Sequence, residues 1–127
     1  MFVGVARYVV QIPGAQSLKD RRQVVKSLKE RLRARLGLSV AEVGDVERYQ
    51  VATLGLAVVG RDSGLCREAL SRATALVGNA KDSILADCRT EVISFGEAGK
   101  GLSEGLETLD PNELGLGSAG HGSKAKD

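Results

Sequence analysis

Hydrophobic positions along the first 95 residues fall into six segments that follow two different periods. Four segments are rich in β-branched residues, which is typical of strands. These predicted strands cover residues 2–12, 38–44, 49–60 and 83–95. Two other segments repeat apolar residues every three or four positions, which indicates amphipathic helices. The predicted helices run from Ser17 to about Leu36 and from Asp62 or Ser63 to about Val77.

Residues at the ends of these segments support the same boundaries. Pro13-Gly14 interrupts the first strand, and Ser17 is a good N-cap for the helix that follows it. Gly37 is placed to end that helix. Residues 45–48 form a short turn between two strands, which predicts a hairpin. Residues 13–17 also offer free backbone N–H groups to a phosphate, as every capped helix does.

The order strand-helix-strand-strand-helix-strand predicts an α+β domain of the ferredoxin-like type. In that fold a four-stranded antiparallel sheet carries both helices on one face, and right-handed crossovers place the first and third strands in the centre. The chain has 127 residues, enough for one such domain. We assign residues 1–95 to this domain. Residues 96–127 hold eight of the 16 glycines and a net charge of −3, so we expect a flexible tail.

The sheet face away from the helices is predicted to be apolar rather than polar. A solvated sheet face normally carries polar side chains, and an exposed apolar patch usually marks an interface. We therefore expect a homodimer interface on this face, formed by Val3, Val5, Val9, Val51, Ala57 and Val59. The alternative is that the tail folds over it. Base stacking on this face is disfavoured, because it lacks aromatic residues apart from Tyr49 near a strand end.

The first predicted helix is strongly basic, with eight Lys or Arg against two acidic residues. Five cations lie within one quadrant of the helix, beside the apolar stripe Leu18, Val25, Leu28, Leu32 and Leu36. These five are Lys19, Arg22, Lys26, Lys29 and Arg33, with Arg21, Arg31 and Arg35 at the flanks. Such a stripe is suited to a phosphate backbone. A merely soluble helix face, an anionic membrane or an acidic protein remain the alternatives.

Candidate catalytic, metal and cofactor sites are absent from the sequence pattern. Cys66 and Cys88 have no metal-binding spacing, and Cys88 is expected to be buried on the helix side of its strand. The sole histidine, His121, lies in the glycine-rich tail. No apolar run approaches the roughly 18–20 residues of a membrane span, and no signal peptide is evident. We therefore expect a cytoplasmic protein that is not an enzyme and needs no metal or cofactor.

Several sequence blocks resemble the YlxP-like family, a bacterial domain of unknown function. They are Met1–Val5, Ile12–Lys19, Arg22–Leu28, Ser39–Val43 and Leu54–Val59, so the resemblance covers about residues 1–95. It implies a small ferredoxin-like domain. Family genes tend to lie beside those for translation initiation factor two and ribosome-binding factor A, which implies a ribosome or RNA connection. The family has no established catalytic residues, so the resemblance assigns none here.

Two functional hypotheses follow from the sequence. The first is a protein that binds ribosomal RNA or ribosomal particles through the basic helix. The second is a homodimeric regulatory module that binds a small metabolite at an interface between sheets. Phosphate contacts weaken steeply with salt whereas a buried metabolite pocket does not, so salt dependence separates the two.

Overall fold

The computed structural model describes residues 1–44 and 48–96. The elements are β1 (Phe2–Gln11), α1 (Leu18–Leu36), β2 (Ser39–Val43), β3 (Val51–Gly60), α2 (Ser63–Gly78) and β4 (Ile84–Ser94). Their order confirms the predicted one, and no boundary differs from its prediction by more than two residues. The predicted tail, residues 96–127, lies outside the described residues apart from Gly96.

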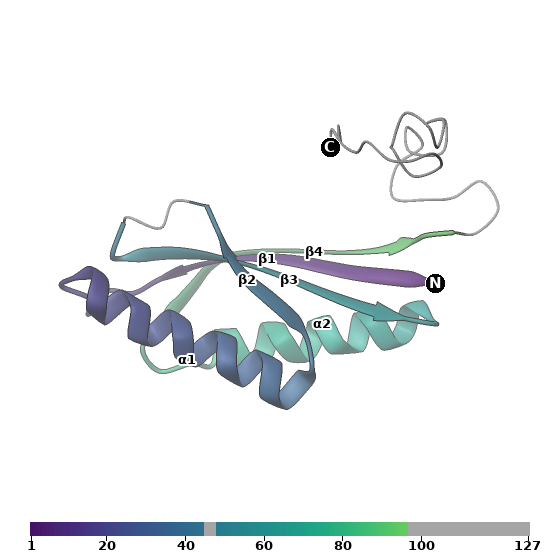
Figure 1. Cartoon of the computed structure of the whole chain (residues 1–127), viewed down its shortest axis with the longest axis horizontal. Coiled ribbons are helices and arrows are strands. Elements are labelled where there is room, and N and C mark those ends of the chain that lie inside the picture. The colour runs from purple at the N-terminus through teal and green to yellow at the C-terminus, as the bar shows by residue number, and fades with distance from the viewer. Residues whose placement is uncertain (45–47, 97–127) are drawn as a thin grey trace, which may run out of the picture. The chain divides into compact units, whose positions relative to one another are not determined.

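The four strands form one antiparallel sheet in the order β2-β3-β1-β4, so β1 and β3 occupy the centre as predicted. The pairing of β1 with β3 runs from Phe2 opposite Gly60 to Gln11 opposite Val51. Both helices lie on the same side of this sheet (Figure 1). The fold is therefore ferredoxin-like.

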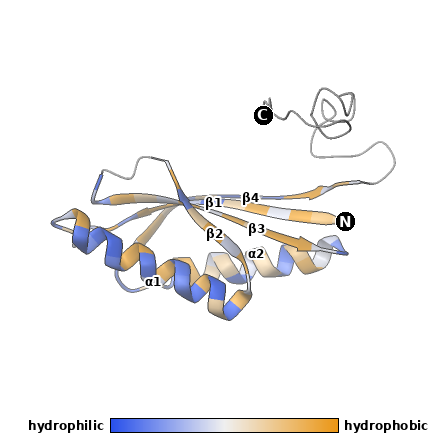
Figure 2. Cartoon of the chain, viewed as in Figure 1, coloured by the Kyte–Doolittle hydropathy of each residue, from blue (hydrophilic) through white to orange (hydrophobic). Residues whose placement is uncertain are grey.

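The hydrophobic core lies between the two helices and the sheet. Alternate residues of the central strands face it, and Tyr8, Val10 and Leu54 have no exposed surface. Figure 2 shows the hydrophobic residues of the helices together with the apolar strands that they cover. The helices contribute the buried side chains Val25, Leu28, Leu32, Leu70, Ala73 and Val77.

Tyr8 is the largest of the fully buried side chains and connects β1 to α2. Its hydroxyl lies 2.7 Å from Oγ1 of Thr74 and donates to the carbonyl of Leu70 at 3.4 Å. Burial raises the pKa of the phenol, and the hydrogen bond with Thr74 opposes that shift. The polar end of this aromatic side chain is therefore satisfied inside the core.

The helix ends follow the sequence signals. Ser17 caps α1, and its Oγ accepts a hydrogen bond from the backbone N–H of Asp20. Gly37 ends α1 with a left-handed φ of 66°, and its N–H donates to the carbonyl of Arg33. Asp62 caps α2 by accepting from the N–H of Leu65. These caps supply partners for backbone groups that the helices leave unpaired.

The apolar stripe of α1 differs from the prediction at two positions. Leu18 is 39% exposed, whereas Arg21 is only 2% exposed. At about 100° per residue, Arg21 lies at the centre of the stripe that Val25 and Leu28 continue. Leu18 lies at its edge. Arg21 is therefore a core position of α1, not a flank of a surface stripe.

The predicted burial of Cys88 in β4 was wrong, although its predicted side of the sheet was right. Ile84 is 53% exposed and Cys88 is also exposed, whereas Leu85 and Val92 pack against the core. The Sγ of Cys88 does approach Oγ1 of Thr74 at 4.0 Å, so this side chain is on the helix side. It stays exposed because β4 is an edge strand, and α2 packs against the central strands β1 and β3.

The close approach of α2 to the sheet depends on a glycine in β1. A Cβ on Gly4 would lie 3.0 Å from Cγ1 of Val58 and 3.1 Å from Cδ1 of Leu70. It would also lie 3.3 Å from the Cβ of Cys66, an atom held by the helix backbone. Any side chain at this position therefore pushes α2 away from β1 and β3.

We predict that Gly4→Ala lowers the free energy of unfolding by about 1–3 kcal/mol, the usual cost of overpacking a core. Urea denaturation followed by circular dichroism measures this change. Gly14→Ala is the matched control, because a Cβ there would meet nothing within 4 Å and the φ of Gly14 is not positive. Equal stability of the two variants would show that α2 has room to move.

Candidate nucleic-acid interface

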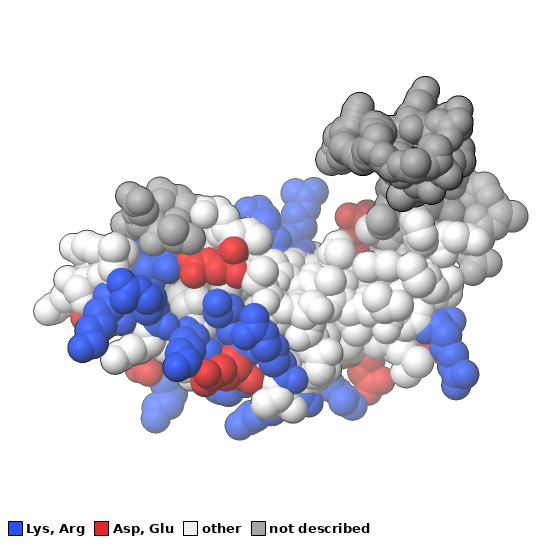
Figure 3. Space-filling view, in the orientation of Figure 1, with Lys and Arg blue, Asp and Glu red and all other residues white. Residues whose placement is uncertain are grey.

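Five cations form one face of α1, which we call the α1 basic face: Lys19, Arg22, Lys26, Lys29 and Arg33. Four of them are exposed, and Lys29 is half-buried. Figure 3 shows Lys and Arg side chains gathered over α1, whereas much of the same view away from this helix is uncharged. The structure thus brings together the five residues that the sequence predicted as a stripe.

Two members of the α1 basic face have partners within the fold. The Nζ of Lys26 lies 3.9 Å from a carboxylate oxygen of Glu30, and both side chains are more than half exposed. This pair contributes little to stability and leaves the ammonium accessible. A guanidinium N–H of Arg33 donates to the carbonyl of Val40 at 2.7 Å, which fixes Arg33 beside β2.

The other three cations of this face have no ion-pair partner in the part of the chain that the structure describes. Among the described residues, no carboxylate lies within 4.0 Å of the charged groups of Lys19, Arg22 or Lys29. Repulsion between neighbouring cations costs a helix a few tenths of a kcal/mol per pair. An anion bound across the face would relieve that repulsion.

The N-terminus of α1 does not offer the free phosphate site expected from the sequence. The N–H of Gln16 donates to Oδ2 of Asp20 at 2.9 Å, and Ser17 Oγ accepts from the N–H of Asp20 at 3.2 Å. The carboxylate of Asp20 therefore occupies the position where an anion would bind. A phosphate there would meet a negative charge.

Arg21 has a structural role that the sequence analysis missed. Its Nε–H donates to the carbonyls of Arg48 at 2.8 Å and Val51 at 3.1 Å, and its guanidinium pairs with the carboxylate of Glu42. Glu42 lies in β2, Val51 begins β3 and Arg48 lies just before it, so one side chain attaches α1 to both strands. The sequence did contain a signal for the burial of Arg21, because this residue lies one helical turn before Val25 on the apolar stripe.

The remaining flanking cations lie away from the α1 basic face. Arg31 is half-buried and lines a cavity between α1 and the segment after α2. Arg35 is exposed near the C-terminal end of α1. The predicted flanks of the stripe are therefore three different environments: the core for Arg21, a cavity for Arg31 and solvent for Arg35.

The predicted dimer residues share the open face of the sheet. The register places Val3 opposite Val59 and Val5 opposite Ala57, with Val9 opposite Thr53 and Val51 opposite Gln11. Val59 is 64% exposed, and the other five are intermediate in exposure. Charged residues join them: Arg7 and Asp87 form an exposed ion pair at 3.5 Å between β1 and β4. The face is thus apolar at the centre of the sheet and mixed towards β4.

The described residues contain no cluster of three or more His, Cys, Asp or Glu side chains that could hold a metal ion. Cys66 is buried, and its Sγ lies 3.7 Å from the carbonyl of Phe2. In the described part of the chain, neither helix is long and apolar enough to cross a membrane. His121, the only histidine, lies outside the described residues.

Comparison with known proteins gives one family. The family described as "Protein of unknown function (DUF503)" matches residues 3–90, a range that includes the whole α1 basic face. No curated protein matches the chain. Among solved structures it is similar to one titled "De novo designed protein Foldit4", at 13% identity and a TM-score of 0.46. That alignment covers 75% of this chain and 99% of the designed one.

We predict that Arg21→Met lowers the free energy of unfolding by about 3–5 kcal/mol, because it leaves a partly buried carboxylate and two carbonyls without their donor. Denaturant unfolding measures the loss. Arg72→Met is the control, since Arg72 pairs with Glu68 on an exposed surface and its loss costs less than about 1 kcal/mol. Adding Glu42→Gln to Arg21→Met should restore part of the stability. Equal losses at Arg21 and Arg72 would refute a structural role for Arg21.

Proposed function

The chain belongs to the DUF503 family of proteins of unknown function, and from that premise we propose that it is a non-enzymatic cytoplasmic protein that binds structured RNA through the α1 basic face. The observation that carries the proposal is the set of three unpaired cations and one weakly paired cation on a single side of one helix. Cations so arranged bind phosphates and release their counterions.

The dimensions of the helix suit a phosphate backbone. From Lys19 to Arg33 the axis advances about 21 Å at the usual 1.5 Å per residue, enough to pass several phosphates. The hydrogen bond from Arg33 to the carbonyl of Val40 holds Arg33 against β2, so the position of this end of the α1 basic face is fixed. Lys19 and Arg22, at the other end, are free to adapt.

A duplex is the favoured form of RNA because the α1 basic face can bind phosphates but has no aromatic side chains on which bases could stack. Single-stranded recognition uses aromatic side chains as stacking platforms. Within the described residues, Tyr49 is the one aromatic side chain with more than a third of its surface exposed, and it lies outside α1. We therefore propose contacts to phosphates with little sequence preference.

An anionic membrane fits this helix less well than RNA does. Helices that bind membranes insert an apolar face between lipids. Three apolar side chains of α1, Val25, Leu28 and Leu32, are at most 2% exposed because they form the core, and Leu18 at the start of the helix is 39% exposed. The resemblance to the YlxP-like family, with gene neighbours that serve translation, also favours ribosomal RNA as the partner.

We predict that Arg22→Glu with Lys26→Glu weakens binding to a short synthetic RNA duplex and to ribosomal subunits. With five phosphate contacts, the slope of log K against log salt should be about −4 to −5 for the unmodified protein. Losing two contacts should reduce its magnitude by about 2. Fluorescence anisotropy across a salt series measures both slopes, and co-sedimentation measures subunit binding.

The matched control is Arg61→Glu with Arg67→Glu, which makes the same change of net charge at exposed positions in and before α2. Circular dichroism confirms folding in both double variants. If the control loses as much affinity, net charge alone explains binding and the proposal fails. Binding to anionic vesicles without binding to RNA would also overturn it.

A separate observation favours a second partner, another copy of this chain at the open sheet face. Ten paired residues along β1 and β3 extend about 33 Å, and four strands span about 19 Å. Because β2 has only five residues, the face offers at most roughly 600 Å² per protomer, which is the lower end of the range for stable interfaces. Arg7 and Asp87 give it both signs of charge, so a twofold axis can pair unlike charges across it.

We predict that Val5→Lys with Ala57→Glu converts a dimer into a folded monomer. These residues are cross-strand neighbours, so the new charges pair on one surface and the sheet is retained. Light scattering at about 100 μM protein, a hundred times a micromolar dissociation constant, measures the mass. A monomeric unmodified protein at that concentration would refute self-association and the metabolite-binding dimer with it.

A further inference from the structure

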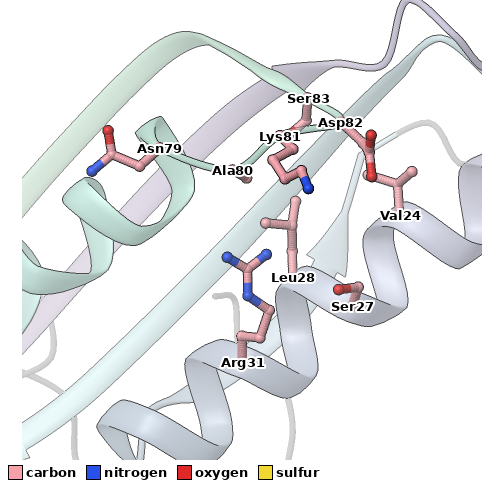
Figure 4. Close-up of a pocket in the computed structure, with 9 residues that line it drawn as sticks. All are labelled: Val24, Ser27, Leu28, Arg31, Asn79, Ala80, Lys81, Asp82 and Ser83. Atoms are coloured by element: carbon pink, nitrogen blue, oxygen red, sulfur yellow. The ribbon is translucent and has the colours of Figure 1, made fainter.

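A cavity of about 390 Å³ lies between α1 and the segment that joins α2 to β4 (Figure 4). Its volume is within the range of small-molecule sites. Nine residues line it: Val24, Ser27, Leu28, Arg31, Asn79, Ala80, Lys81, Asp82 and Ser83. The cavity uses the side of α1 that carries Arg31, so it is separate from the α1 basic face.

Two cations extend into the same space. In Figure 4 the guanidinium of Arg31 and the ammonium of Lys81 both point into the cavity, the first beside the Leu28 side chain and the second above it. The carboxylate of Asp82 lies on the side of Val24. No carboxylate of the described residues lies within 4.0 Å of Arg31 or Lys81. The lining thus has a net positive charge and free donors of the kind that bind oxyanions.

A second cavity of about 380 Å³ borders the first and shares Val24, Lys81 and Asp82 with it. The rest of its wall is of mixed polarity and comprises Ile12, Pro13, Gly14, Ala15, Asp20 and Gln23. Hydroxyl groups of a ligand can form hydrogen bonds with the Asp20 carboxylate and the Gln23 amide. The carbon atoms of the same ligand can pack against the side chains of Ile12 and Pro13. This combination is typical of a site for a sugar.

We propose that these adjoining cavities bind a small sugar phosphate, with the phosphate held by Arg31 and Lys81. The planar guanidinium of Arg31 provides two parallel donors to phosphate oxygens, and Lys81 contributes a second positive charge. The sugar lies over Val24 towards Gln23.

The test is a titration of the full-length protein with ribose 5-phosphate and, in separate arms, with inorganic phosphate and ribose. Isothermal calorimetry measures affinity, and ¹⁵N chemical shifts of the amides of residues 80–83 locate the site. We expect the ester to bind more tightly than inorganic phosphate, and ribose to bind least. Equal affinity for ester and inorganic phosphate would refute the sugar subsite. No shifts at millimolar ester would refute the whole site.

Three variants give the site a distinctive signature. Arg31→Gln should weaken ester binding tenfold or more, whereas Arg35→Gln, on the same helix but outside the cavity, should not change it. Ser83→Ala should leave ester binding unchanged, because the Ser83 hydroxyl has almost no accessible surface and does not reach the cavity. Loss of ester binding in Ser83→Ala, or equal losses in Arg31→Gln and Arg35→Gln, would overturn the assignment.

The RNA-binding variant separates this site from the proposed function. Arg22→Glu with Lys26→Glu should retain ester binding, because both residues lie on the other side of α1. Loss of RNA binding with retained ester binding supports two sites. Loss of both in a folded protein would place the ester on the α1 basic face and refute the cavity.

Discussion

Both helices lie on one face of the four-stranded sheet and leave the other face open, and the rest of this structure depends on that arrangement. The covered face has the core side chains Tyr8, Val10 and Leu54, none of which is exposed. The opposite face keeps Val59 64% exposed although it is as apolar as its buried neighbours in β3. Apolar burial stabilises the fold by about 25 cal/mol per Å². The apolar area that is still exposed lies on the open face, so a partner that covers this face gains that stabilisation.

The same arrangement gives α1 three different sides. One side packs on the sheet and includes Arg21, which is buried because its guanidinium binds two carbonyls and Glu42. The second side carries the α1 basic face beside β2. The third side, with Arg31, lines the cavity next to the α2–β4 connection. A single basic helix therefore places its cations in environments with different roles.

These environments predict different physical behaviour for the ligands proposed at each. Contacts between exposed lysines and phosphates are screened by salt and tolerate different sequences. A phosphate held between Arg31 and Lys81 is partly enclosed, so salt weakens it less. The sheet face depends on apolar area and responds mainly to side-chain size and polarity. The three surfaces can therefore be studied separately on one protein.

The sequence by itself determined the elements of this protein, because the periods of apolar residues and the capping residues Ser17, Gly37 and Asp62 act locally. It also determined the α1 basic face, since helical geometry alone places its five cations, at positions 19, 22, 26, 29 and 33, on one side. Only the tertiary structure decided that Arg21 is buried and that Cys88, on an edge strand, is exposed. It alone brought Arg31 next to Lys81 and left Ser83 without a partner. Those outcomes depend on contacts between residues far apart in the chain, which a local pattern does not encode.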